Sequence, residues 1–474
     1  MRFSSYSILS DSIPGEGRVL MNGISGALDL LDPGLSEDLE AAFAAGVPER
    51  VIPGLSADTR AQFVERGHLT EWSADEERQI VVTLAGAAHE AMAGRPSFMI
   101  VPNLDCNYRC TYCFERPLQN TLKSAGAEIT HRKGNVVMRQ EQVRWIYEGI
   151  AQLKAAAGMA PGGQIILYGG EPLDRTNRPV VETIVREGQA RGHFFAAITN
   201  GHDLDAYMDL LGSGGIEQIQ VSIDGPKAVH DRRRVYVGKE SSFDRLTDNA
   251  RRALTETDAQ LQVRVHVDPA NIHLFEETID IFEEEGWLDH PQVVIYGNTV
   301  YERTEDGGIH ARIEHGDIDR QLDTIARRAR NIHTSAPEIH AATAALPALT
   351  NGERFRLKGT YCSANSGNYI FAPDGRIYAC WESVGKSCSR IGAYGRGGIV
   401  LDAGMVDAWF KRSIATLPGC QTCPYALVCG GGCAQYAEYD SGTLYAAYCD
   451  DLQRTFRSAL ARTVRRQLQP AEEA

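Results

Sequence analysis

The sequence lacks any apolar run long enough to cross a bilayer. Its longest apolar stretches, such as Ile80–Leu84, are far shorter than the roughly 20 residues that a membrane-spanning helix needs. The first residues, Met1–Asp11, also lack the apolar core of a secretory signal. We therefore expect a cytoplasmic protein with no membrane partner.

A second absence is concentrated positive charge. The chain has 48 Lys and Arg against 62 Asp and Glu, a net charge of −14 at pH 7, and no long run of basic residues. Because nucleic acids are bound through basic patches, a nucleic-acid partner is not expected. No solenoid repeat or low-complexity tract is present. The content of 43% hydrophobic and 23% charged residues is that of an ordinary folded protein.

The middle of the chain alternates short apolar runs with helical patterns. A length of 474 residues allows roughly three domains, and residues 96–305 carry the longest regular pattern. Repeated strand–helix units of this kind predict parallel strands. The fold class is therefore α/β, a partial barrel of six βα units that does not close to eight. The six expected strands are Ser97–Pro102, Gln164–Tyr168, His193–Thr199, Ile216–Ile223, Leu261–Val267 and Gln292–Tyr296.

Three further units flank this barrel. Residues 1–95 predict a small α+β domain, with a hairpin at Arg18–Leu31 and helices at Ser36–Ala45 and Ala74–Met92. Residues 306–358 read as a mostly helical connector. Residues 359–474 hold eight of the eleven cysteines and end in a helix near Leu452–Leu468. We expect this last unit to bind inorganic ligands.

The cysteines cannot all form internal disulfides, because their number, eleven, is odd. Cys106, Cys110 and Cys113 form a CxxxCxxC motif in the loop after the first strand. Three thiolates at this spacing can converge on one inorganic centre. On a cubane cluster, three ligands leave one iron free for a small molecule. A zinc site or three incidental buried thiols are the alternatives.

Four short motifs follow successive strands, and they place polar groups at one face of the sheet. CxxxCxxC is followed in order by GGEP at Gly169–Pro172, TNG at Thr199–Gly201 and SIDG at Ser222–Gly225. Over residues 96–300 this series resembles the radical S-adenosylmethionine (SAM) superfamily. The resemblance implies a 4Fe–4S cluster on Cys106, Cys110 and Cys113, and a 5'-deoxyadenosyl radical that takes hydrogen from unactivated carbon. It implies SAM contacts from Tyr112, Gly169, Gly170, Glu171, Pro172, Thr199, Asn200, Ser222, Asp224 and Arg234.

The remaining cysteines follow the pattern Cx12Gx4C, then CxxCx5CxxxC, then a single Cys. This pattern resembles the SPASM extension of peptide maturases, which binds two auxiliary 4Fe–4S clusters. The resemblance implies Cys362, Cys380 and Cys433 as ligands of the first auxiliary cluster, with Cys388 able to complete it. It implies Cys420, Cys423, Cys429 and Cys449 for the second. Eleven cysteines and the SAM chelate would then fill the twelve iron positions of three clusters. A Cys388 that is not a ligand, and a zinc ribbon on Cys420–Cys433, remain open.

One departure from a family branch bears on the product. The sulfatase-maturing branch has an Asp base directly after the cysteine that aligns with Cys380, and this chain has Trp381 there. Glu382 follows one position later, from which we expect it to point elsewhere. Oxidation of Cys or Ser is therefore a lesser alternative.

The amino-terminal block and the CNYRCTYCFE segment resemble the thioether-forming branch of SPASM maturases, in particular the family that matures the quinohemoprotein amine dehydrogenase small subunit. The resemblance implies a small Cys-containing protein or peptide substrate, a leader bound at an amino-terminal sheet edge, and an electron donor such as flavodoxin or ferredoxin. The product would join a Cys sulfur to a methylene carbon of Asp or Glu. Glu115 and His266 are weak candidates for the base that takes the thiol proton. Other SPASM modifications, and an iron–sulfur electron carrier without enzymatic activity, are the alternatives.

Overall fold

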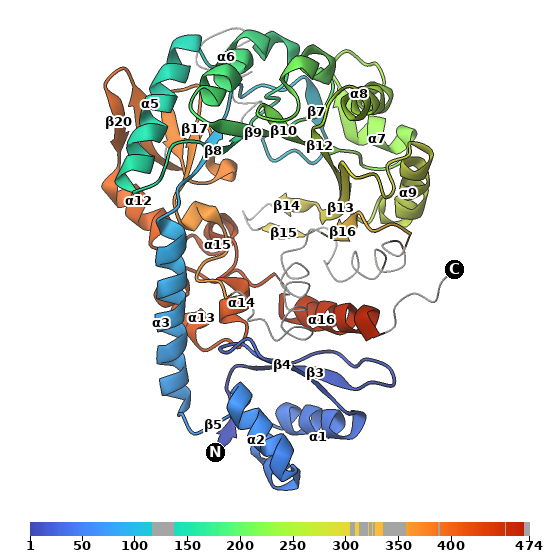
Figure 1. Cartoon of the computed structure of the whole chain (residues 1–474), viewed down its shortest axis with the longest axis vertical. Helices are drawn as coiled ribbons and strands as arrows, with labels where there is room; N and C mark the ends of the chain where they lie inside the picture. Colours follow the sequence, from blue (N-terminus) through green and yellow to red (C-terminus); the bar gives the residue numbers. More distant parts are fainter. Residues whose placement is uncertain are drawn as a thin grey trace.

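The computed structural model describes residues 1–115, 137–303, 309–311, 328–334, 357–386, 389–450 and 452–468, together with Gln321 and Ile325. An arched sheet of eleven strands forms its centre (Figure 1). The strand order is β16-β13-β12-β10-β9-β8-β6-β17-β18-β19-β20. All neighbouring strands from β16 to β17 pair in parallel. From β17 onward, β18, β19 and β20 each pair antiparallel with the strand before. The bounds are β6 Ser97–Ile100, β8 Gly163–Leu167, β9 His193–Ile198, β10 Ile216–Ser222, β12 Gln260–Val267, β13 Val293–Thr299, β16 Ile332–Thr334, β17 Asn368–Phe371, β18 Arg376–Tyr378, β19 Arg390–Gly395 and β20 Gly398–Leu401.

The six strands predicted from the sequence are confirmed, and they lie side by side in chain order. Alternation along each strand explains their placement. On β12, the buried residues Leu261, Val263 and Val265 join the main core, and the residues between them face the inner side of the arch. The helices cover the outer side of the arch (Figure 1). They are α5 Gln140–Ala156, α6 Arg178–Gln189, α7 Lys227–Arg233, α8 Ser242–Glu256 and α9 Phe275–Glu284, with the short helices η2 Arg175–Asn177, η3 Leu204–Ala206, η4 Met208–Leu210 and η5 Ile272–Leu274.

The sheet extends beyond the predicted six strands at both ends, by β16 at one end and by β17 to β20 at the other. β17 pairs in parallel with β6, in the register Asn368 to Ser97, so the cysteine-rich unit joins the barrel through backbone hydrogen bonds. β16 pairs with β13 at the other end. Two strands lie in the range that the sequence predicts as a helical connector. They are β15 (Ile309–Ala311), which pairs with β14 (Tyr301–Arg303), and β16. The Ala- and Arg-rich composition of that range favours a helix, whereas β15 is set by pairing with the nearby β14 and β16 by pairing with β13. Most of the range lies outside the described residues.

The amino-terminal unit has the predicted hairpin and helices. Its sheet runs in the order β2-β3-β4, and the N-caps Asp32 and Ser73 fix the starts of α1 and α3 because their side chains accept backbone N–H groups. A small core of its own forms around Phe3, Leu39 and Phe63. The bounds are β1 Arg2–Phe3, β2 Ser7–Leu9, β3 Arg18–Asn22, β4 Leu28–Leu31, α1 Pro33–Ala44, η1 Pro48–Gly54, α2 Ala57–Arg66, β5 Leu69–Thr70 and α3 Ala74–Ala93.

The amino-terminal unit also packs against the carboxyl-terminal one (Figure 1). Met21 and Val19 on β3 share a core with Phe456 and Leu460 of the predicted last helix, α16. The other elements of that unit are η6 Ser363–Asn365, η7 Trp381–Ser383, α12 Ala403–Phe410, η9 Ile414–Thr416, α13 Pro418–Gln421, α14 Ala426–Cys429, α15 Ala434–Ser441 and α16 Leu452–Leu468. None of the helices in the described part of the chain combines the length and apolar character that a bilayer crossing requires.

Candidate functional site

The CxxxCxxC loop follows β6 and is braced by a short strand pair. β7 (Tyr108–Cys110) pairs antiparallel with β11 (Arg234–Tyr236), which sets Arg234 opposite Cys110. The Tyr108 N–H donates to Cys106 Sγ at 3.3 Å, and the Asn200 amide approaches the same sulfur at 3.8 Å. Donors aimed at a sulfur stabilise a thiolate. Burial, together with the charges of neighbouring acidic groups, raises the pKa of all three thiols in this loop.

The GGEP backbone fits tightly against this loop. Gly170 N–H donates to Asn103 O at 3.0 Å, and Glu171 N–H donates to Asp105 O at 2.9 Å. A Cβ on Gly170 would lie 2.1 Å from Asp105 O. Gly169 has φ of 123°, and a Cβ there would lie 2.6 Å from Asn103 O. These glycines therefore allow the end of β8 to meet the cysteine loop.

Glu171 is 2% exposed, and donors from the end of β9 surround its carboxylate. Its Oε1 accepts from the Thr199 hydroxyl at 2.5 Å and from Leu173 N–H at 2.8 Å, and its Oε2 accepts from Asn200 N–H at 2.6 Å. Burial raises the pKa of Glu171 to about 7, although these hydrogen bonds act in the opposite direction. The predicted residues Glu171, Thr199 and Asn200 thus lie in direct contact, and Pro172 follows in the same turn.

A second group gathers at the ends of β10 and β12. The Tyr112 hydroxyl donates to the fully buried Asp224 carboxylate, and it accepts from Arg234 Nη1 at 2.8 Å. His266 Nδ1 lies 3.2 Å from the same hydroxyl and 3.3 Å from Asp224 Oδ1. The Arg233 guanidinium lies over the Tyr112 ring, 5.1 Å from its centroid. The structure therefore places Tyr112, Asp224 and Arg234 together, next to the cysteine loop.

The charges in this second group favour an ionised Asp224 and a neutral His266. Burial would raise the pKa of Asp224, but the hydrogen bond from His266 and the charge of Arg234 lower it overall. Burial and the charge of Arg264 lower the pKa of His266 to about 4, even though Asp224 opposes this. His266 is consequently a weak proton acceptor, already engaged by two partners.

The other candidate base, Glu115, has a different environment. Burial, followed by the charges of Glu382 and Glu171, raises its pKa to about 8. Glu382 is itself 8% exposed, and its charge also raises the pKa of Cys380. The expectation that Glu382 points elsewhere is therefore wrong. In the η7 turn, with three residues per turn, Trp381 projects outward with 48% exposure while Glu382 turns inward.

Sequence reasoning missed Arg264 on the inner side of the sheet. Ser222, Arg264 and Tyr296 are neighbours across β10, β12 and β13. Arg264 Nη2 donates to Ser222 Oγ at 3.3 Å, and its Nε–H has no partner among the described residues. Polar residues at every second position of the strand, 262, 264 and 266, were the available signal.

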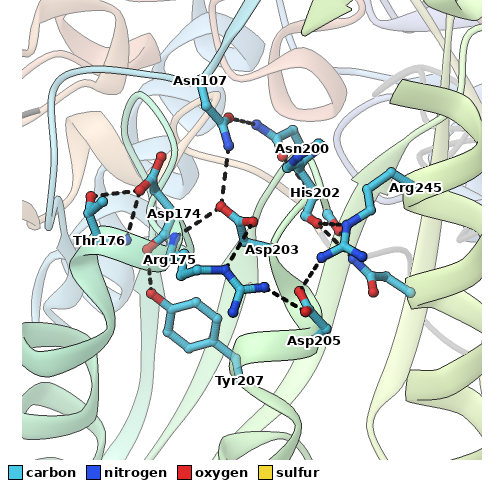
Figure 2. A network of polar contacts seen from close by, with 12 residues as sticks. Asn107, Asp174, Arg175, Thr176, Asn200, His202, Asp203, Asp205, Tyr207 and Arg245 are labelled. Atoms are coloured by element: carbon cyan, nitrogen blue, oxygen red, sulfur yellow. Dashed lines mark hydrogen bonds and ion pairs between the residues drawn. The ribbon is translucent and has the colours of Figure 1, made fainter. Parts of the chain in front are cut away.

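Figure 2 shows a polar network that fixes the loops around the cysteine motif. Asn107 accepts from the Asn200 amide at 2.6 Å and donates to Asp203 at 3.4 Å. Arg175 then bridges Asp203 and Asp205, and Arg245 on α8 donates to Asp205 at 2.7 Å. The loops after β6, β8 and β9 are thereby tied together. This network was also missed, because its members come from four separate segments.

The cysteines of the last unit form two groups. In the first, the charges of Cys433 and Cys362 raise the pKa of Cys380, after burial. In the second, the charges of Cys449 and Cys423 raise the pKa of Cys420, after burial, to about 11, and Cys429 is similarly affected by Cys420 and Cys423. Each of these cysteines thus lies near other members of the set that the resemblance implies. That either set binds a cluster stays a prediction, and Cys388 lies outside the described residues.

The residues fit iron–sulfur clusters in their chemistry. Buried thiols with raised pKa release their protons when a metal binds, and each group offers three or four sulfurs. Within the described ranges, no three His, Cys, Asp or Glu side chains are placed to share one metal ion. A cubane cluster sets a different requirement, because each thiolate binds a different iron.

Comparison with known proteins agrees with this geometry. Residues 100–257 match the family model of the radical SAM superfamily, so the chain carries a radical SAM domain. No curated protein matches the chain in sequence. Native anSMEcpe with bound AdoMet and Cp18Cys peptide is 16% identical, with a TM-score of 0.55, over 78% of this chain and 98% of that chain. Streptococcus suis SuiB is 13% identical, with a TM-score of 0.51, over 94% and 98%. SuiB bound to precursor peptide SuiA is 14% identical, with a TM-score of 0.51 over the same shares. At these identities the likeness establishes a shared fold.

Proposed function

We propose that this chain is a radical SAM peptide maturase that joins a Cys sulfur to a methylene carbon of Asp or Glu in a small protein substrate. The observation that carries the proposal is the contact between the CxxxCxxC loop and the Gly170–Glu171 turn. It places the cysteine loop beside the buried carboxylate of Glu171, and Tyr112 of the same loop contacts the buried carboxylate of Asp224. Solved structures of this fold that contain AdoMet and peptides support a peptide substrate.

The residues divide into cluster and cofactor contacts. Cys106, Cys110 and Cys113 would hold a 4Fe–4S cluster, and the surrounding polar groups would hold SAM. When bound, this pair supplies a 5'-deoxyadenosyl radical that removes a hydrogen atom from the substrate. The SAM contacts would come from Tyr112, Gly169, Gly170, Glu171, Pro172, Thr199, Asn200, Ser222, Asp224 and Arg234, all in the described part of the chain.

Arg264 supports an acidic side chain as the partner of the substrate cysteine. Its Nε–H is buried and meets no acceptor in the described part of the chain, and a guanidinium binds carboxylates through paired N–H groups. It lies on the inner side of the sheet beside Ser222, near the predicted cofactor site. We infer that it orients the carboxylate of the substrate Asp or Glu, so that the neighbouring methylene faces the cofactor.

The two cysteine groups of the last unit would hold the auxiliary clusters, 4Fe–4S each, which would remove the surplus electron after the carbon–sulfur bond forms. An external donor such as flavodoxin or ferredoxin would reduce the first cluster. A leader segment of the substrate would add to the edge strand β4, which pairs only with β3 within the described residues. The α2 residue Arg66 holds that strand through Asp29 at 2.6 Å.

The test is the intact mass of a small Cys-containing polypeptide after anaerobic incubation with reconstituted enzyme, SAM and reductant, followed by thiol alkylation. We expect loss of a hydrogen pair per bond, loss of alkylatable thiols, and fragments that join Cys to Asp or Glu. Formation of 5'-deoxyadenosine with all thiols still free would refute the assigned product. Absence of 5'-deoxyadenosine altogether would indicate an electron carrier.

Two variants test the role of Arg264. Arg264→Met should still cleave SAM, while crosslinking falls about tenfold or more because the substrate carboxylate loses its partner. Arg252→Met is the matched control, since Arg252 lies on the exposed face of α8 in a pair with Glu256. If Arg264→Met instead abolishes SAM binding, Arg264 serves the cofactor and the proposed orientation of the substrate is wrong.

Oxidation of Cys or Ser is the second candidate, because Glu382 lies buried beside Cys380. This is close to where the sulfatase-maturing branch has its Asp base. An aldehyde-reactive probe distinguishes the two products: labelling of the treated polypeptide indicates oxidation, and unlabelled product with lost thiols indicates a thioether.

A further inference from the structure

Arg412 is fully buried, with 0% exposure, between the two cysteine groups of the last unit. It follows α12, and each of its three guanidinium nitrogens donates to a backbone carbonyl. Nη1 donates to Gly432 O at 3.0 Å, Nη2 donates to Gly431 O and Ala446 O at 2.9 Å each, and Nε donates to Leu444 O. No carboxylate pairs with it among the described residues.

A buried guanidinium needs negative charge nearby, because burial removes the water that solvates it. Carbonyl groups satisfy its N–H donors but carry no net charge. The groups near Arg412 that can carry negative charge, as thiolates, are Cys433 and Cys362 of the first cysteine group, and Cys420 and Cys429 of the second. Burial lowers the pKa of Arg412, and the charges of these four cysteines raise it. One cation is therefore shared by both groups.

The carbonyls that Arg412 binds belong to the segments that connect the two groups. Gly430–Gly432 is the link between Cys429 of the second group and Cys433 of the first. All three glycines have positive φ, at 78°, 91° and 71°. A Cβ on Gly432 would lie 1.8 Å from Tyr448 O, and one on Gly430 would lie 2.3 Å from the Thr360 carbonyl carbon. The other segment, around Leu444 and Ala446, leads to Cys449. The guanidinium thus fixes both cysteine groups through their shared backbone.

We propose that Arg412 is a positioning residue common to both auxiliary cluster sites, which raises the reduction potentials of both clusters and holds the three-glycine link between them. This inference rests on the proposed function, which assigns clusters to these cysteines. A 4Fe–4S cluster with thiolate ligands carries net negative charge, and reduction adds one more electron. A nearby fixed cation therefore favours the reduced form. Both clusters are then better acceptors for the electron released when the crosslink forms.

The test uses the full chain, reconstituted with iron and sulfide, in wild-type form and as Arg412→Gln, Arg412→Lys and Lys411→Gln. Lys411 is the matched control, because it is the adjacent residue but exposed, in a surface pair with Asp407. Midpoint potentials are measured by redox titration with electron paramagnetic resonance. Each protein also carries Cys106→Ala, Cys110→Ala and Cys113→Ala, so that only the auxiliary clusters contribute.

For Arg412→Gln we expect the equilibrium constant for reduction of each cluster to fall about tenfold. This lowers each midpoint potential by about 59 mV for one electron. Lys411→Gln should leave both unchanged, and Arg412→Lys should restore most of the shift. A fully loaded Arg412→Gln with both potentials unchanged would overturn the proposal. If Arg412→Gln cannot hold clusters, Arg412→Lys decides: loaded clusters with near-native potentials support the proposal, and failure to load or a full shift overturns it.

A second readout separates charge from hydrogen bonding. In the cluster-free chain no cluster charge faces Arg412, so Arg412→Gln should cost much less thermal stability there than in the loaded chain. An equal loss in both forms would show that the hydrogen bonds alone explain the residue. Iron analysis of the wild-type chain tests the presence of the auxiliary clusters separately from the role of Arg412. About twelve irons per chain agree with three clusters, whereas about four would refute the auxiliary clusters themselves.

Discussion

Replacement of Gly170 by Ala tests how the GGEP turn holds the cysteine loop. The added Cβ would lie 2.1 Å from Asp105 O and 2.4 Å from its carbonyl carbon. Real Cβ contacts essentially never fall under 3.0 Å, so the two backbones must separate by about 1 Å. Both contacting atoms belong to the main chain, and no side-chain rotation can relieve the overlap. Gly170 does not have positive φ, so the expected loss comes from the collision and not from backbone strain.

The separation breaks two buried backbone hydrogen bonds, from Gly170 N–H to Asn103 O and from Glu171 N–H to Asp105 O. With roughly 1–2 kcal/mol for each buried bond lost, the free energy of unfolding should fall by about 2–4 kcal/mol. The functional loss should be larger. A displacement of about 1 Å between the cysteine loop and Glu171 can reduce the rate of SAM cleavage about 100-fold.

The assay compares Gly170→Ala with Gly397→Ala, because a Cβ on Gly397 meets nothing within 4 Å. Thermal unfolding, iron content and 5'-deoxyadenosine production are measured for both. We expect the control to match the wild type in all three, and Gly170→Ala to lose stability and cleavage. Wild-type cleavage by Gly170→Ala would refute the argument that this close backbone approach builds the site.

Three further predictions follow from the described contacts. Glu171→Gln should weaken SAM binding about tenfold or more, because its amide would face donors such as Asn200 N–H; equilibrium binding measures this, with the half-exposed Glu182→Gln as control, and unchanged affinity would contradict it. Burial lowers the pKa of His230 to about 4, against about 6.5 in the unfolded chain. The neutral His230 therefore favours the folded state fully above pH 6.5. As the pH falls from 6.5 toward 4, the free energy of unfolding decreases by up to about 1.4 kcal/mol per pH unit. Melting temperatures of His230→Asn should depend less on pH in that window, and slopes equal to the wild type would refute this. Phe456→Ala should lower the free energy of unfolding by about 3–5 kcal/mol, because Phe456 of α16 is fully buried against the amino-terminal sheet. Denaturant unfolding measures this loss, with the exposed Leu468→Ala as control. A loss no larger than that of the control would contradict the shared core.

The strands could be predicted because their signals are local, whereas the cysteine groups are expected only from a recognisable family pattern. Each of the six strands is a short apolar run whose alternating residues are buried under helices, as on β12. The end of such a strand places GGEP, TNG and SIDG at one edge. The pairing of Cys362 with Cys433, and of Cys420 with Cys449, came from the resemblance, since spacing alone does not specify which distant cysteines meet.

What the sequence could not reveal depends on contacts between distant segments. β17 has four residues, and its partner β6 lies more than 260 positions earlier; no local signal marks it as a barrel strand. Arg412 follows Lys411 and reads as a surface charge, although it is buried by Gly431, Gly432 and Leu444. The sequence predicts the wrong direction for the Glu382 side chain. The short η7 turn reverses the expected alternation, and a turn of only three residues leaves no recognisable pattern in the sequence.

The packing of the two ends of the chain limits how far the predicted boundaries describe independent units. The Tyr6 hydroxyl donates to Gln421 O, between Cys420 and Cys423, and a Cβ on Gly23 would lie 2.2 Å from Pro424 O. β3 contributes Val19 and Met21 to a core that also holds Val428 and Phe456. A cut near residue 95 would therefore expose the apolar face that supports the second cysteine group. It follows that the amino-terminal sheet, proposed to bind a leader, and the second cysteine group stabilise each other, so each should be studied in the full chain.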